Sequence, residues 1–65
     1  MKMIDYLLDR YGPTMDANQT GEVTHHHPSH IRALFKSGEL PGVKIGGRWI
    51  IPTAKLAEIL EGGRI

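Results

Sequence analysis

The sequence of 65 residues predicts a mainly α-helical fold with one small β-hairpin. Apolar residues recur at helical spacing in several segments, and two short β-compatible runs are joined by a glycine-rich turn. Glycine or proline separates the segments. A chain of this length has room for one marginal core, so we expect a single compact domain.

The first predicted helix covers residues 2–11. Gly12 and Pro13 end it, because glycine caps a helix and proline cannot continue one. We divide the chain into this additional helix, at residues 1–12, and a main domain at residues 13–65. One stripe, which we assign to the core, contains Ile4, Leu7, Leu8 and Tyr11.

Two further helices follow in the middle of the chain. Asp16 and Gln19 have the spacing of a capping box, which begins a short helix over residues 17–23. Gly21 within this helix indicates close approach by another helix. The next helix runs from Pro28, a residue favoured at the first helical position, to Ser37 before Gly38. Its predicted inner residues are Ile31, Leu34 and Phe35.

Residues 43–52 predict the hairpin. A three-residue loop at residues 46–48 would pair Ile45 with Trp49 and Val43 with Ile51, so that these four apolar side chains point inward. The same parity directs Lys44 and Ile50 outward. A last helix then starts at Pro52 and Thr53 and ends before Gly62, with Leu56, Ile59 and Leu60 as its apolar residues.

A helix followed directly by a hairpin is the pattern of a winged helix-turn-helix, and double-stranded DNA is the partner that this pattern predicts. The helix at residues 28–37 would enter the major groove. Arg32 can bind guanine, Ala33 can approach a thymine methyl group, and Lys36 can contact a phosphate. We predict DNA contacts from this helix at His27, Ser29, His30, Arg32, Ala33 and Lys36, and from the hairpin, or wing, at Lys44, Gly47 and Arg48.

The net charge of +1 is small for a DNA-binding protein, but the charges are unevenly distributed. From residue 31 onward there are six lysines and arginines, ending with Arg64, against three acids; before it there are two against four. This asymmetry predicts one basic face, whereas an ordinary mixed surface is the alternative. A single copy should bind weakly, so useful affinity would need several copies side by side.

Four histidines, at positions 25, 26, 27 and 30, invite a zinc-site interpretation. His26 precedes Pro28, and no acid or cysteine lies close enough to complete an obvious site, so we expect no metal or other cofactor. We assign the histidines to the turn and to the phosphate-facing end of the helix, where protonation should strengthen DNA binding. Ser29 lacks the orienting carboxylate of a catalytic triad, and we expect no enzymatic activity.

The composition also limits where the protein acts. The sequence has no cysteine, so it forms no disulfide and no thiolate metal site, as suits a reducing compartment. We see no apolar run long enough to span a membrane. The acids near the N-terminus do not fit a signal peptide. We therefore expect a cytoplasmic protein that does not contact membranes.

From Met15 to Leu60 the chain resembles the excisionase-type, MerR-like family of winged helix-turn-helix proteins. The motifs that carry the resemblance are residues 37–41 (Ser-Gly-Glu-Leu-Pro), 43–46 (Val-Lys-Ile-Gly) and 48–52 (Arg-Trp-Ile-Ile-Pro). The resemblance implies a phage or prophage recombination directionality factor on the nucleoid of a bacterial host. Such a factor binds repeated sites beside an attachment site, bends DNA cooperatively and directs an integrase toward excision.

The chain departs from the family pattern at several positions. His25 stands where a turn glycine is common, Gly21 replaces a small alanine, and Ile50 occupies a place that is often basic. We interpret the outward Ile50 as a contact between protomers. A small transcriptional regulator with the same fold is the alternative function, because both read DNA with the same residues. A protein–protein adaptor that displays the N-terminal helix is a third hypothesis.

Overall fold

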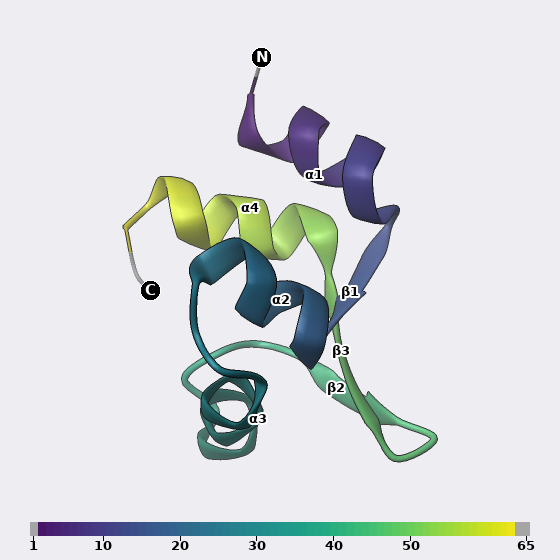
Figure 1. Cartoon of the computed structure of the whole chain (residues 1–65), viewed down its shortest axis with the longest axis vertical. Helices are drawn as coiled ribbons and strands as arrows, with labels where there is room; N and C mark the ends of the chain where they lie inside the picture. The colour runs from purple at the N-terminus through teal and green to yellow at the C-terminus, as the bar shows by residue number, and fades with distance from the viewer. Residues whose placement is uncertain (1, 64–65) are drawn as a thin grey trace.

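The computed structural model describes residues 2–63. Helices and strands follow one another in the order α1 (Met3–Tyr11), β1 (Thr14–Asp16), α2 (Ala17–Thr24), α3 (Pro28–Ser37), β2 (Val43–Ile45), β3 (Arg48–Pro52) and α4 (Thr53–Glu61). The three strands form one antiparallel sheet in the order β1-β3-β2. Along the longest axis, α1 lies at one end and α3 at the other (Figure 1). Four helices with a small sheet form a fold compatible with the predicted winged helix-turn-helix.

Helix α1 packs against α4 and buries only part of its predicted stripe. Leu7 is fully buried, and Ile4 and Tyr11 are half-buried. Leu8, however, is 43% exposed, so its assignment to the core was wrong. Successive helical residues are rotated by about 100°, and α4 covers one side of α1. Leu8, which directly follows Leu7, therefore points away from the contact with α4.

The capping box of α2 is confirmed. The Gln19 backbone N–H donates to Asp16 Oδ1 at 2.8 Å, and the Asp16 backbone N–H donates to Gln19 Oε1 at 3.1 Å. A Cβ atom built on Gly21 would lie 2.5 Å from the carbonyl oxygen of His26. The close approach expected at Gly21 therefore involves mainly the backbone of the α2–α3 turn, and the first residue of the next helix, Pro28, would lie 3.5 Å from this Cβ through its nitrogen.

The turn between α2 and α3 is closed by a histidine in a left-handed conformation. His25 has φ 60° and ψ 36°, and it is the only non-glycine residue with positive φ among the described residues. Helix α3 then begins with His27 as its cap and Pro28 at its start, and Gly38 ends it. Ile31 and Phe35 are buried and Leu34 is half-buried, as the spacing predicted.

The predicted register of the hairpin was wrong by one residue. The structure pairs Ile45 with Arg48, Lys44 with Trp49 and Val43 with Ile50 across a two-residue turn. Gly46 and Gly47 both have positive φ, 57° and 83°, as a type I′ turn requires. A type I′ turn matches the twist of the two strands that it joins. In this hairpin the preference for that turn decides the register, although the register leaves some apolar side chains exposed.

The true register changes which side chains share a face. Val43 and Ile45 are 56% and 62% exposed and lie on the same face as Ile50, which is half-buried. Ile50 is therefore not an isolated outward apolar residue. We call Val43, Ile45 and Ile50 the outer hairpin face. Lys44 lies instead on the face of Trp49, contrary to the expectation that these two residues point in opposite directions.

Strand β1 was not predicted from the sequence. Its central residue, Met15, pairs with Ile51 of β3, and both side chains are fully buried. The core is completed from the helices and the loop after α3, and the Phe35 ring stacks on that of Trp49 with centroids 5.5 Å apart. The main core cluster contains Met15, Ala17, Ile31, Phe35, Leu40, Ile51 and Leu56.

Candidate nucleic-acid interface

Helix α3 lies at one end of the molecule (Figure 1), and its polar residues are exposed. Its buried residues, Ile31 and Phe35, lie on the opposite face against the core. This division follows from the helical period, because residues three and four apart share a face. All of the predicted DNA contacts on or beside this helix are exposed, namely His27, Ser29, His30, Arg32, Ala33 and Lys36.

His27 is held at the start of α3 by its own ring. Its Nδ1 accepts the backbone N–H of Ser29 at 3.1 Å and lies 2.8 Å from the Ser29 hydroxyl oxygen. An Nδ1 that accepts a hydrogen bond carries no proton, so Nε2 bears the N–H of the neutral ring. Protonation of Nδ1 would remove the cap. This loss opposes the gain in DNA affinity that protonation of the histidines was expected to bring.

The other histidines do not gather around a common point. The rings of His26 and His30 lie 5.0 Å apart at an angle of 49°. His25 lies in the turn after α2 and borders a different part of the surface. Among residues 2–63, no group of three or more His, Cys, Asp or Glu side chains is placed to hold a metal ion.

The wing carries two of the predicted DNA contacts on different faces of the sheet. Lys44 is exposed on the face of Trp49, which is also the side that packs against α3 through Phe35. Arg48, at the end of the turn, lies on the other face. Its Nη2 donates to Asp16 Oδ2 at 2.6 Å, and its side chain remains 67% exposed. The third predicted wing residue, Gly47, forms the turn itself.

A cleft of about 290 Å³ joins the wing to the two helices of the helix-turn-helix. It brings together Arg32 of α3 and Arg48 of the wing, which are 16 positions apart in the sequence. Two polar residues at the start of α2, Asp16 and Asn18, also line it, and neither was predicted as a site residue. The full lining is Asp16, Ala17, Asn18, Arg32, Gly47, Arg48 and Trp49.

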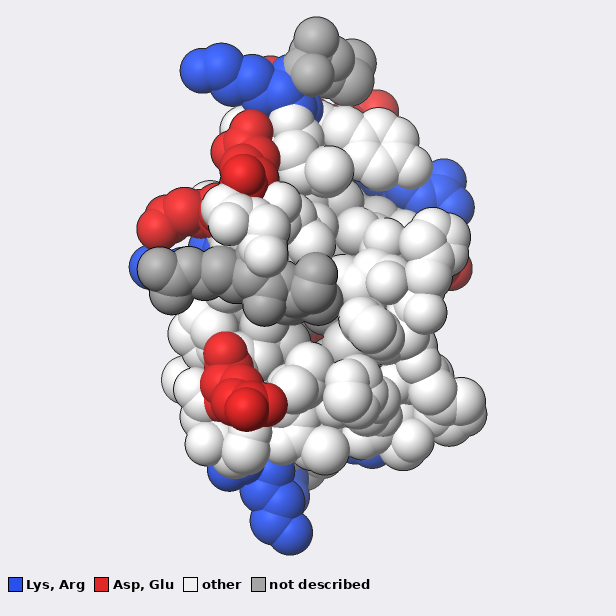
Figure 2. Space-filling view, turned by 90° about the vertical axis from the view of Figure 1, so that its left-hand side faces the viewer, with Lys and Arg blue, Asp and Glu red and all other residues white. Residues whose placement is uncertain are grey.

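The basic side chains are not confined to one end of the long axis. On the face shown in Figure 2, lysine and arginine side chains protrude at both ends, and the acidic side chains lie between them and near the upper end. The lower end is the end of α3 in Figure 1. Arg64, which was counted with the basic half of the sequence, lies outside the described residues.

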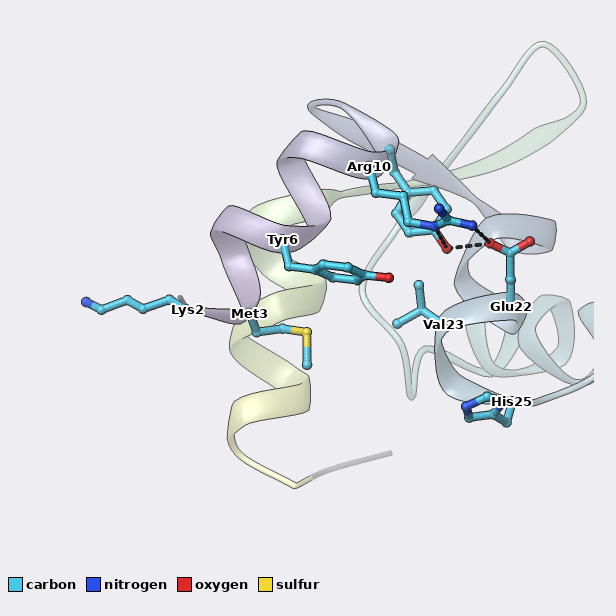
Figure 3. Close-up of a pocket in the computed structure, with 8 residues that line it drawn as sticks. Lys2, Met3, Tyr6, Arg10, Glu22, Val23 and His25 are labelled. Atoms are coloured by element: carbon cyan, nitrogen blue, oxygen red, sulfur yellow. Dashed lines mark hydrogen bonds and ion pairs between the residues drawn. The ribbon is translucent and has the colours of Figure 1, made fainter.

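A larger pocket of about 600 Å³ lies between α1 and α2, away from the predicted DNA contacts (Figure 3). At its edge the Tyr11 hydroxyl donates to Glu22 Oε1 at 2.5 Å, and Arg10 Nη2 lies 3.4 Å from the same oxygen. The hydrogen bond from Tyr11 lowers the pKa of Glu22. Burial, followed by the same hydrogen bond, raises the pKa of Tyr11. This cluster ties α1 to α2.

Comparison with known proteins assigns most of the chain to one sequence family. A family model described as a helix-turn-helix domain matches residues 14–64, so the match excludes α1. No curated protein and no solved structure matches the chain. Within residues 2–63, no helix is both long enough and apolar enough to cross a membrane.

Proposed function

Because the chain belongs to the helix-turn-helix domain family, we propose that it is a sequence-specific DNA-binding protein whose α3 enters the major groove. The observation that carries this proposal is the cleft in which Arg32 of α3 and Arg48 of the wing meet. Two arginines from separate elements then face the same stretch of DNA. The protein acts by binding, without catalysis and without a cofactor.

The contacts of α3 divide into those that read bases and those that bind phosphates. Arg32 binds guanine through two hydrogen bonds, a contact that contributes about 1–3 kcal/mol of discrimination. Ala33 lies beside it on the exposed face and approaches a thymine methyl group. His27 and Lys36, near the two ends of the helix, contact phosphates, and Ser29 and His30 contact the DNA beside them. Arg48, Gly47 and Lys44 of the wing bind the adjacent backbone or minor groove.

Two substitutions test this division of roles. Arg32→Ala should reduce the preference for a duplex selected by the wild-type protein over the single-base variants of that duplex. The matched control is Lys55→Ala, at an exposed position of α4, which should leave this preference unchanged. Arg48→Ala should weaken binding to all duplexes and reduce the salt slope by about 1. Unchanged base preference in Arg32→Ala, or loss of one sequence alone in Arg48→Ala, would contradict the assignment.

We further propose that the protein is an excisionase-type factor that binds repeated sites cooperatively. With about four to five phosphate contacts per protomer the salt slope is near −4, which gives one copy weak binding. The outer hairpin face supports association between neighbouring copies, since Val43 and Ile45 expose more than half of their surface. Ile45→Ser and Ile50→Ser should lower cooperativity on duplexes with two sites while single-site affinity is kept. Unchanged cooperativity in both variants would refute this contact.

The excisionase role and the alternative, a small transcriptional regulator, use the same DNA-binding surface. An excisionase bends a duplex with tandem sites and shifts a partner integrase toward excision in a recombination assay. A regulator changes transcription from a promoter that contains its site and leaves recombination unaffected. A gene for an integrase beside an attachment site would favour the first function. An adaptor that binds protein through α1 would shift no duplex at low salt.

A further inference from the structure

The two oxygens of the Asp16 carboxylate accept hydrogen bonds from two different elements, α2 and the wing. Oδ1 caps α2 by accepting the Gln19 backbone N–H at 2.8 Å, and Oδ2 accepts the Arg48 guanidinium at 2.6 Å. An N-cap needs only one acceptor, and Asn or Ser caps about as well as Asp. Capping therefore leaves the negative charge and the second oxygen of Asp16 unexplained.

The pair is asymmetric. The Asp16 side chain is 19% exposed and is fixed by the capping box, whereas the Arg48 side chain is 67% exposed at the tip of a two-residue turn. The pair therefore joins a well-fixed carboxylate to a side chain that has few other contacts to hold it. A guanidinium has five N–H donors, and the described contact to Asp16 uses one of them. This contact leaves the other donors for a ligand, and Arg48 lines the same cleft as Arg32 and Asn18.

We propose that Asp16 is a positioning residue that holds the guanidinium of Arg48 beside Arg32, ready for a DNA phosphate. This inference rests on the proposed DNA-binding function. Ordering a long side chain before binding removes part of the entropy cost of the complex. DNA that binds α3 then meets both arginines in place, so Asp16 raises the affinity for DNA although its own charge repels DNA.

Asp16→Asn separates this role from capping and from charge. Asparagine keeps the acceptor for Gln19, so α2 stays capped, but it loses the carboxylate partner of Arg48. We expect binding to a duplex selected by the wild-type protein to weaken about 3- to 10-fold. Binding to a scrambled duplex should weaken by a similar factor, because a phosphate contact does not depend on the base sequence. The matched control, Asp9→Asn at an exposed position of α1, makes the same change in net charge at the opposite end and should not weaken binding to either duplex.

A double-mutant cycle with Arg48→Ala gives the decisive comparison. If Asp16 positions Arg48, then Arg48→Ala costs more affinity in the wild-type background than in Asp16→Asn. If Asp16 only neutralises Arg48, the order is reversed, and this result would overturn the inference. In the free protein, the ¹⁵N relaxation of the Arg48 Nε–H group should report an ordered side chain that becomes mobile in Asp16→Asn; equal mobility would also overturn it.

The same titrations distinguish failure of this inference from failure of the proposed function. A wild-type protein that enriches no duplex from a random pool and binds none at low salt would overturn both. A wild-type protein that selects a sequence, together with an Asp16→Asn variant that binds both duplexes as tightly as the wild-type protein or more tightly, would overturn the positioning role alone.

Discussion

Replacing His25 by glycine should stabilise the protein, because this residue adopts the left-handed conformation that ends α2. The left-handed region costs a non-glycine residue about 1–2 kcal/mol. Glycine adopts it without strain but has more conformational freedom to lose on folding, a cost of about 0.5–1 kcal/mol. The net gain expected for His25→Gly is therefore about 0.5–1 kcal/mol.

The gain is large enough to measure by thermal unfolding. With an unfolding entropy of about 2.1 cal/mol/K per residue, a 65-residue chain has about 0.14 kcal/mol/K, so Tm should rise by about 4–7 °C. His25→Ala is the control, since it removes the same imidazole and keeps the strained backbone. If the alanine variant were stabilised as much as the glycine variant, or if glycine gave no gain, the assignment of strain to this backbone would be wrong.

Three further predictions concern the core and two polar contacts. Ile51→Ala should cost about 2–5 kcal/mol of unfolding free energy, because Ile51 is fully buried; a loss below 1 kcal/mol in urea titrations would contradict this. Glu22→Gln should flatten the acid limb of stability against pH. Because the pKa of Glu22 is lowered in the folded protein, its contribution to the free energy of unfolding is complete above the pH range in which a free glutamate titrates. That contribution is lost as pH falls through the lowered pKa, so an unchanged acid limb in the variant would count against the contact with Tyr11. His27→Ala should remove the cap of α3 and cost about 0.5–2 kcal/mol of unfolding free energy, whereas His27→Asn should keep the cap; equal stability of the two variants in urea titrations would refute this.

The sequence was most informative where local chemistry decides the structure. Asp16 and Gln19 predicted the start of α2, and Pro28 and Gly38 marked the ends of α3, because caps depend on residues a few positions apart. The inner and outer faces of α3 followed from the helical period. Leu8 shows the limit of the same period, since a stripe of apolar residues does not reveal how much of it a neighbouring helix covers.

The sheet was harder to predict because its pairing depends on distant segments and on turn geometry. Strand β1 has three residues, too few for a visible alternation, and it exists because Met15 packs opposite Ile51. The hairpin register followed from a preference for burying apolar side chains, whereas the Gly46-Gly47 pair selected a two-residue turn. The exposed Val43 and Ile45 are the consequence.

The candidate site also combines features that the local sequence predicted with features that depend on distant contacts. Its exposed α3 residues and wing arginine were predicted from the sequence, but the role of Asp16 was predicted only as a cap. Its contact with Arg48 spans 32 positions, and no local pattern reports which second partner a capping carboxylate will find. The cleft that unites Arg32 with Arg48 likewise appears only when α2, α3 and the wing are packed together.

The central claim is that α3 and the wing form the DNA-binding surface, and mapping that surface by amide chemical-shift changes tests it most directly. A duplex selected from a random pool is added to ¹⁵N-labelled protein. We predict the largest changes at residues 27–36, at the start of α2 and at the hairpin turn, with little change in α1. Changes concentrated on α1 and its pocket beside Tyr6, with α3 unaffected, would contradict the claim.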